Sequence, residues 1–370
     1  MRYIALFTLF FHLSLSAQYV TTYKDIMDLV HVFDDGYSSI LEPLPLVSYK
    51  VGKTAMLYVN SQGRLKAYYK GKTTTLIDNA PDYFVTDNFV GYYNLGNIAV
   101  LNNNKFQSLD GLSLPIYWVS DSLIVWGSNL SDTRVFYEGN SYDIEQWAIS
   151  DTTIKYGDKF AYEFAKISDN IFAYIDRADN FKVFYHGAQG LLEGYRPESF
   201  RVDRDIVMYK DFIGNFKVFS KGISYETNIP YTANYQTGEG FFVFYDNQNR
   251  LNVWYEGETT ILCQARPREL LVKENIIAFT DQGNNFYAWY KGKMEMLERF
   301  QPLSMKADND LLVYQEQYGR LMGYYYGKQI PVSSNIVQGD NYNVYNEVVT
   351  YSLVRGETSI WSKGKTYTYR

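Results

Sequence analysis

The chain has 370 residues and a formal charge of −6, so it is long enough for one large domain or two ordinary ones. Charged residues make up 21% of it, which excludes wholesale disorder, and the mild excess of acids disfavours nucleic acid or an anionic membrane as the main partner. Aromatic residues are unusually abundant, with 37 Tyr, 23 Phe and 6 Trp. Such rings favour strands, where they pack on cross-strand neighbours, so the composition predicts an all-β fold.

Residues 1–17 have the pattern of a signal peptide. Arg2 supplies a positive start, Ile4–Leu15 an apolar run and Ser14–Ala17 a small-residue cleavage site. The run is shorter than the ~18 residues that a membrane span requires, and no later stretch is long enough. We therefore expect an exported protein that is periplasmic or extracellular and associated with the cell surface. Cys263 is the single cysteine, which excludes an intramolecular disulfide.

The pattern of residues 18–35 is compatible with either a short helix or one more strand, whereas residues 36–370 carry a repeat. The repeat is anchored on a glycine that usually follows an aromatic residue by two positions, at Gly36, Gly71, Gly139, Gly187, Gly222, Gly257, Gly292, Gly327 and Gly364. Four consecutive steps from Gly187 are each 35 residues long. So regular a period predicts a repeat architecture.

Two steps depart from this period. The step of 68 residues before Gly139 contains a degenerate copy at Leu101–Asn104. The step of 48 residues before Gly187 contains an insertion within residues 150–169, where Phe160–Phe164 is a candidate hairpin.

Each unit reads as four short strands, which we call a to d, as the stretch around residue 210 illustrates. Strand a is the apolar run Ile206–Tyr209, a polar turn follows at Asp211–Asn215, and strand b is Phe216–Phe219 before the glycine. Short strands c and d complete the unit. Four antiparallel strands in series predict a β-propeller, in which we expect strand a to line the central channel.

The count of strand a predicts a single propeller of about eight or nine short four-stranded blades, within a range of seven to nine. The last unit lacks a recognisable strand d, and Leu46–Lys50 has a strand-like pattern that can supply it. We therefore expect the ring to be closed by this N-terminal strand joining the C-terminal blade, which hides both edges of the sheet.

The hairpin of strands a and b resembles the secreted propeller repeats of the TolB-like (WD40-like, PD40) kind. The residues that carry the resemblance include Val207–Tyr209, Gly214–Asn215 and Val218–Phe219. The resemblance implies a propeller fold, export and contact with other proteins. It implies no functional residue.

The sequence contains no recognisable catalytic, cofactor or metal signature. Only His31 and His186 remain after removal of residues 1–17, too few for a histidine-based triad or metal site. Acidic turns such as Asp176–Asp179 and Asp246–Asn249 are oxygen-rich, but Asp and Asn are expected there for backbone reasons. We therefore expect a protein without a cofactor that is not an enzyme.

The interpretation is an exported β-propeller that acts as a protein-binding or scaffold module of the cell envelope. The candidate partner-binding residues are charged side chains in or beside the glycine turns, which would suit an acidic partner: Lys70, Lys72, His186, Lys221, Lys291, Lys293 and Lys328. The alternative is a carbohydrate-binding or carbohydrate-active propeller. Aromatic residues clustered at one channel mouth beside two carboxylates would favour that alternative.

Overall fold

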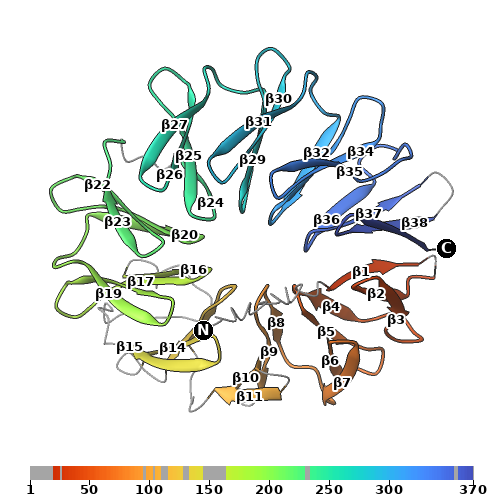
Figure 1. The fold of residues 1–370 in the computed structure, drawn as a ribbon. Helices are drawn as coiled ribbons and strands as arrows, with labels where there is room; N and C mark the ends of the chain where they lie inside the picture. Colours follow the sequence, from red (N-terminus) through yellow and green to blue (C-terminus); the bar gives the residue numbers. More distant parts are fainter. Residues whose placement is uncertain are drawn as a thin grey trace, which may run out of the picture.

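The computed structural model describes residues 20–25, 27–94, 97–102, 105–109, 116–127, 133–144, 164–229, 234–353 and 357–369. These residues form ten antiparallel sheets arranged as blades around a central axis (Figure 1). The chain is therefore an all-β propeller, as predicted, but the predicted range of seven to nine blades is wrong. The candidate hairpin at Phe160–Phe164 has only its last residue within the described part of the chain.

The blades follow one another in chain order. Blade 1 is β1 (Val20–Lys24), β2 (Val30–Asp34) and β3 (Tyr37–Ile40). Blade 2 is β4 (Ser48–Val51), β5 (Ala55–Val59), β6 (Leu65–Tyr69) and β7 (Lys72–Ile77). Blade 3 is β8 (Tyr83–Val85), β9 (Val90–Asn94), β10 (Asn97–Asn102) and β11 (Lys105–Leu109). Blade 4 is β12 (Ile116–Val119), β13 (Ile124–Gly127), β14 (Thr133–Tyr137) and β15 (Asn140–Ile144). Blade 5 is β16 (Ala165–Ser168), β17 (Ile171–Ile175), β18 (Phe181–Tyr185) and β19 (Ala188–Glu193).

The second half of the ring is more regular. Blade 6 is β20 (Ser199–Asp203), β21 (Ile206–Lys210), β22 (Phe216–Ser220) and β23 (Ile223–Glu226). Blade 7 is β24 (Gln236–Gly238), β25 (Phe241–Tyr245), β26 (Leu251–Tyr255) and β27 (Glu258–Cys263). Blade 8 is β28 (Glu269–Lys273), β29 (Ile276–Thr280), β30 (Phe286–Tyr290) and β31 (Lys293–Glu298). Blade 9 is β32 (Ser304–Asp308), β33 (Leu311–Gln315), β34 (Leu321–Tyr325) and β35 (Lys328–Pro331). Blade 10 is β36 (Tyr342–Tyr345), β37 (Val348–Ser352), β38 (Thr358–Ser362) and β39 (Lys365–Tyr369).

The missing blade in the sequence-based count is blade 1. In this blade β1 corresponds to strand a. Its sequence, Val-Thr-Thr-Tyr-Lys, lacks the apolar run that predicts strand a in the other blades. Gly36 lies in the turn between β2 and β3, as the 35-residue spacing indicated. The proposed boundary between residues 35 and 36 therefore falls inside this blade.

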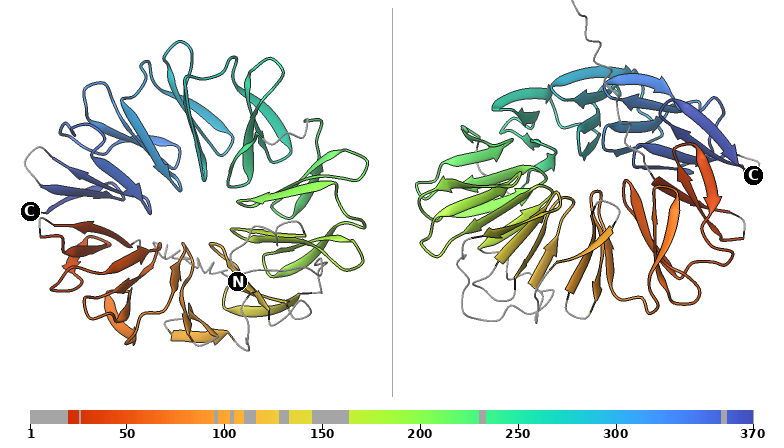
Figure 2. Two further views of the ribbon diagram at one scale, coloured as in Figure 1. Left: turned by 180° about the vertical axis from the view of Figure 1, so that it is seen from behind. Right: turned by 60° about the horizontal axis from the view of Figure 1, so that its bottom comes forward.

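The predicted closure of the ring is also wrong. Strand β4, which overlaps Leu46–Lys50, pairs with β5 in its own blade, with Ser48 opposite Val59. The last blade instead takes its innermost strand, β36, from its own repeat, with Tyr342 opposite Tyr351. Blades 10 and 1 lie next to each other and share no strand. They are shown in blue and red in Figures 1 and 2.

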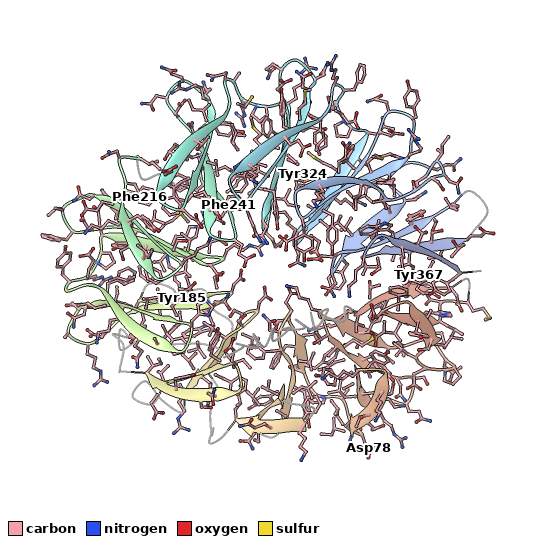
Figure 3. All side chains as sticks on the ribbon, viewed as in Figure 1. Asp78, Tyr185, Phe216, Phe241, Tyr324 and Tyr367 are labelled. Atoms are coloured by element: carbon pink, nitrogen blue, oxygen red, sulfur yellow. The ribbon has the colours of Figure 1, made fainter. Side chains whose placement is uncertain are left out.

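The hydrophobic core lies between neighbouring blades. In one cluster, Ile276 and Phe286 of blade 8 pack against Leu312 and Tyr314 of blade 9. Second strands are buried on both faces because a blade packs on each side of them, which explains their unbroken apolar runs. Figure 3 shows Phe216, Phe241 and Tyr324 among the blades and Asp78 at the outer rim.

The first strand of each four-stranded blade, which corresponds to strand d, lies nearest the axis (Figure 1). First strands of adjacent blades, such as β16 and β20 or β32 and β36, contact one another as they converge. The expectation that strand a lines the channel is therefore wrong. Strand d carries charged residues such as Asp203 and Asp308, so carboxylates lie closer to the axis than the sequence indicated.

Candidate functional site on the turn face

Two sets of turns lie on the same face of the ring. The inner turns join the first and second strands of a blade, and the outer turns join the third and fourth strands. Because the four strands alternate in direction, both sets emerge at the same end of each sheet. We call this surface the turn face.

The outer turns are two-residue hairpin turns with left-handed backbone at both positions. In blade 6, Lys221 has φ 51° and Gly222 has φ 82°. Both values belong to a type I′ turn, whose twist matches that of the flanking strands. The aromatic-x-Gly frame therefore specifies a tight hairpin that holds the preceding lysine or glutamate at its tip.

All seven predicted site residues are exposed on this face or at its rim. Four are at the tips of outer turns: Lys70, His186, Lys221 and Lys291. The other three are the first residues of outermost strands: Lys72, Lys293 and Lys328.

Salt bridges and hydrogen bonds already occupy three of these side chains. Lys221 Nζ lies 2.6 Å from Glu256 Oε1, and Lys291 Nζ lies 3.6 Å from Asp310 Oδ1. His186 Nδ1 is 2.6 Å from the hydroxyl of Tyr137. The remaining four lysines make no salt bridge within the described part of the chain.

The inner turns carry a feature that the sequence analysis missed, a circle of carboxylates. Each of eight inner turns contributes one acid, Arg204 adds a cation to one of these turns, and Lys53 lies in the inner turn of blade 2, which has no acid. We call these acids the inner acidic circle: Asp87, Asp121, Asp169, Asp205, Glu239, Glu274, Asp310 and Glu347. The sequence signal of this circle is the recurring polar pair in the inner turns, such as Asp87-Asn88, which also fits ordinary turn chemistry.

Burial and mutual repulsion perturb this circle. Burial, reinforced by the nearby carboxylates of Asp121 and Asp205, raises the pKa of Asp169 to about 7, although the Arg204 guanidinium opposes the shift. Burial also raises the pKa of Glu239. Like charges held close together favour protonation, so the Asp169 carboxyl is partly protonated near pH 7.

The two cations partly offset the acids. Lys53 Nζ lies 2.8 Å from Asp87 Oδ2, and Arg204 Nη1 lies 3.1 Å from Glu274 Oε1. The turn face is therefore acidic at its centre and mixed at its rim, rather than mostly basic.

Two pockets open on the turn face. The larger, of about 530 Å³, is lined by inner and outer turns of blades 2 to 5, and we call it the blade 2–5 pocket. Its polar lining includes Thr54, Asp87, Asn88, Glu138, Asn170 and His186. The second, of about 380 Å³, is lined by Lys53, Lys221, Lys291, Asp205, Glu239 and Glu347, together with neighbouring aromatic rings.

A short hydrogen-bonded chain borders the blade 2–5 pocket. The Tyr137 hydroxyl donates to Glu138 Oε1 at 3.1 Å, and His186 Nδ1 is its other neighbour. Because the hydroxyl has one proton, His186 donates from Nδ1 in this arrangement. Burial and the Glu138 carboxylate raise the pKa of Tyr137 to about 12, so this hydroxyl keeps its proton.

Other kinds of site were sought in the described residues. They contain no group of three or more His, Cys, Asp or Glu side chains arranged to hold a metal ion. No helix among them is long and apolar enough to cross a membrane. Cys263, half-buried, forms no disulfide.

Comparisons with known proteins complete the description. No curated protein matches the sequence. Among solved structures, the computationally designed Ika8 protein is 14% identical, with 86% of this chain and 96% of that chain covered and a TM-score of 0.32. Kluyveromyces lactis Hsv2p is 12% identical over 82% of this chain and 95% of its own, with a TM-score of 0.29. The tricorn protease is 10% identical over 95% of this chain and 44% of its own, with a TM-score of 0.25.

None of these likenesses transfers a function to this chain. The sequence profile of the 10-bladed beta propeller domain, by contrast, matches residues 14–367, nearly the whole chain. It agrees with the ten sheets of the structure, and the protein belongs to the family of 10-bladed beta propeller domains.

Proposed function

We propose that this protein is an exported, non-catalytic propeller that binds a protein partner of the cell envelope through its turn face. The observation that carries the proposal is the charge pattern of that face. Four exposed lysines without salt bridges in the described residues lie on blades 2, 8 and 9, outside a circle of eight carboxylates. Complementary charges at an interface steer association and select partners, and a rigid ring holds such a pattern in place.

This pattern determines what the partner would present. Acidic groups on the partner would contact the rim lysines, and a basic element would lie over the inner acidic circle. Binding through such contacts weakens as salt rises, because exposed charges are screened over about 8–10 Å at physiological ionic strength. The signal-peptide pattern of residues 1–17 supports export to the compartment where this partner would be found.

The test uses residues 18–370 immobilised and exposed to a native envelope extract at two salt concentrations. We expect one protein to be retained, more weakly at high salt. The double variant Lys72→Glu/Lys328→Glu should lose at least tenfold in affinity for that protein. The matched control is Arg177→Glu/Arg299→Glu, which reverses two exposed cations away from the turn face. Equal loss in both variants, or retention unaffected by either, would contradict the proposal.

A carbohydrate-binding role is the second candidate function. The blade 2–5 pocket favours it, because Tyr69 and Tyr137 lie there beside the carboxylates of Asp87 and Glu138.

A further inference from the structure

The blade 2–5 pocket borders one irregular blade. One position in each blade lies two residues before the start of the outer turn. In the nine blades other than blade 3 this residue is aromatic: Phe33, Tyr68, Phe136, Phe184, Phe219, Trp254, Trp289, Tyr324 and Trp361. In blade 3 the corresponding residue is Leu101, which lines the pocket. Leucine is smaller than the ring at this position in the other blades, so it leaves more open volume on the turn face beside blade 3.

The pocket presents both hydrogen-bond donors and acceptors. The amides of Asn88 and Asn170 and the hydroxyl group of Ser122 can do both, while Glu138 accepts. The two asparagines are held in place, since Asn88 Nδ2 donates to Ser122 Oγ at 2.8 Å and Asn170 Nδ2 donates to Asp205 Oδ1 at 2.9 Å. Their amide oxygens keep free lone pairs for a ligand.

The charge of the lining disfavours anionic ligands and does not select for cationic ones. Among the described residues, no lysine or arginine lines the pocket, in contrast to the three lysines of the second pocket. Of its two carboxylates, that of Asp87 is paired with Lys53 at 2.8 Å, and that of Glu138 is exposed, so solvent screens its charge. The lining therefore fits a neutral ligand with many hydroxyl groups.

The size and walls of the pocket agree with this class. Its volume of about 530 Å³ falls within the roughly 300–1,000 Å³ of small-molecule sites. The half-buried ring of Tyr69 lies in the lining with Lys70 Nζ 5.1 Å from its centroid, and the part of the ring that the ammonium leaves uncovered supplies an apolar surface for the C–H face of a sugar ring. We propose that the blade 2–5 pocket binds a neutral hexose or N-acetylhexosamine unit. This proposal rests on the second candidate function and is independent of docking through the rim lysines.

The test is saturation-transfer NMR and calorimetry on residues 18–370 with the methyl glycosides of glucose, galactose, mannose and N-acetylglucosamine at up to 50 mM. We expect at least one to bind with a Kd in the millimolar range. Glucosamine and glucuronate, which add a positive or a negative charge to the same ring, should bind at least fivefold more weakly than the best neutral glycoside. Tighter binding of either charged sugar would overturn the proposal.

Two variants assign the binding to this pocket. Asn88→Ala/Asn170→Ala removes two exposed or half-buried amides and should weaken binding at least tenfold. The control Asn275→Ala changes the equivalent inner-turn position of blade 8, outside the pocket, and should leave the Kd within twofold. Leu101→Trp places in blade 3 the side chain that blades 7, 8 and 10 have at this position, and should abolish binding without lowering the melting temperature. No binding of any neutral glycoside, or binding that persists in Leu101→Trp, would refute the assignment. Failure of this test leaves protein retention by the rim lysines unaffected, so the two proposals fail separately.

Discussion

Asp211 lies at the start of the turn between β21 and β22 and is 1% exposed. Its Oδ1 accepts from the backbone N–H groups of Ile213 at 3.1 Å and Asn215 at 2.8 Å. Asp176, Asp246 and Asp281 start the equivalent turns of blades 5, 7 and 8, so this side chain is a repeated structural device. These hydrogen bonds are the backbone role expected of Asp in such turns.

Replacement of Asp211 by alanine should destabilise the protein by about 2–3 kcal/mol, because two backbone N–H groups lose a charged acceptor. Asp211→Asn should cost only about 1 kcal/mol, since Asn60 makes the same two backbone contacts in blade 2. Chemical denaturation of both variants measures the difference. Equal destabilisation would show that charge, and not the turn contacts, dominates at this position.

The pH dependence of these variants follows from the pKa of Asp211. Burial acts to raise this pKa, but the hydrogen bonds from Asn215 and the Lys217 ammonium outweigh it and hold the pKa below its usual range. A lowered folded-state pKa contributes stability that is present above about pH 4 and is lost as the pH falls through the folded value. The stability gap between the wild type and Asp211→Asn should therefore close on acidification.

At the scale of single elements, the outer turn is the feature that the sequence specifies most completely. The glycine follows a residue that is itself left-handed, as Lys70 is before Gly71 with φ 48° and 75°. A Cβ at Gly257 would approach the Tyr225 ring to 2.8 Å, whereas a Cβ at Gly71 meets nothing within 4 Å. Gly257 is thus required by its left-handed backbone and by its packing against Tyr225, whereas Gly71 is required by its left-handed backbone alone.

Gly71→Ala should therefore cost about 1–2 kcal/mol, the price of a left-handed alanine. Gly257→Ala should cost about 2–4 kcal/mol, because the Tyr225 ring must also shift. Denaturant titration of the two variants isolates the packing contribution, since the backbone penalty is shared. A larger loss in Gly71→Ala would contradict this explanation.

At the scale of the whole molecule, the ring closes by side-chain contacts between blades 10 and 1, which share no strand. Asn346, in the inner turn of blade 10, is 1% exposed, and its Nδ2 donates to the carbonyl oxygens of Val20 and Gly52, both at 2.9 Å. The rings of Tyr23 and Tyr369 stack 5.6 Å apart across the same junction. One amide thus connects the last blade to the first and second blades.

Asn346→Ala should lower the melting temperature and increase hydrogen exchange in β1 and β36, because two buried carbonyls lose their donor. The control is Asn309→Ala, at the equivalent left-handed position of blade 9, where the amide contacts only the adjacent Asp308 side chain. Both variants share the backbone penalty, so the difference measures closure. Exchange that rises equally in all blades would argue against a local role at the junction.

The sequence alone determined the all-β propeller, the four-stranded unit, the hairpin turns and the exposure of the seven candidate residues. These properties are local, because a 35-residue repeat and its turn glycines specify each blade without reference to the rest of the chain. The number of blades, the closure, the inner acidic circle and the blade 2–5 pocket were decided only by the tertiary structure. Each of them depends on residues from different repeats that the ring brings together, such as Asn346 with Val20 and Asn88 with Asn170, and spacing along the chain does not encode that proximity.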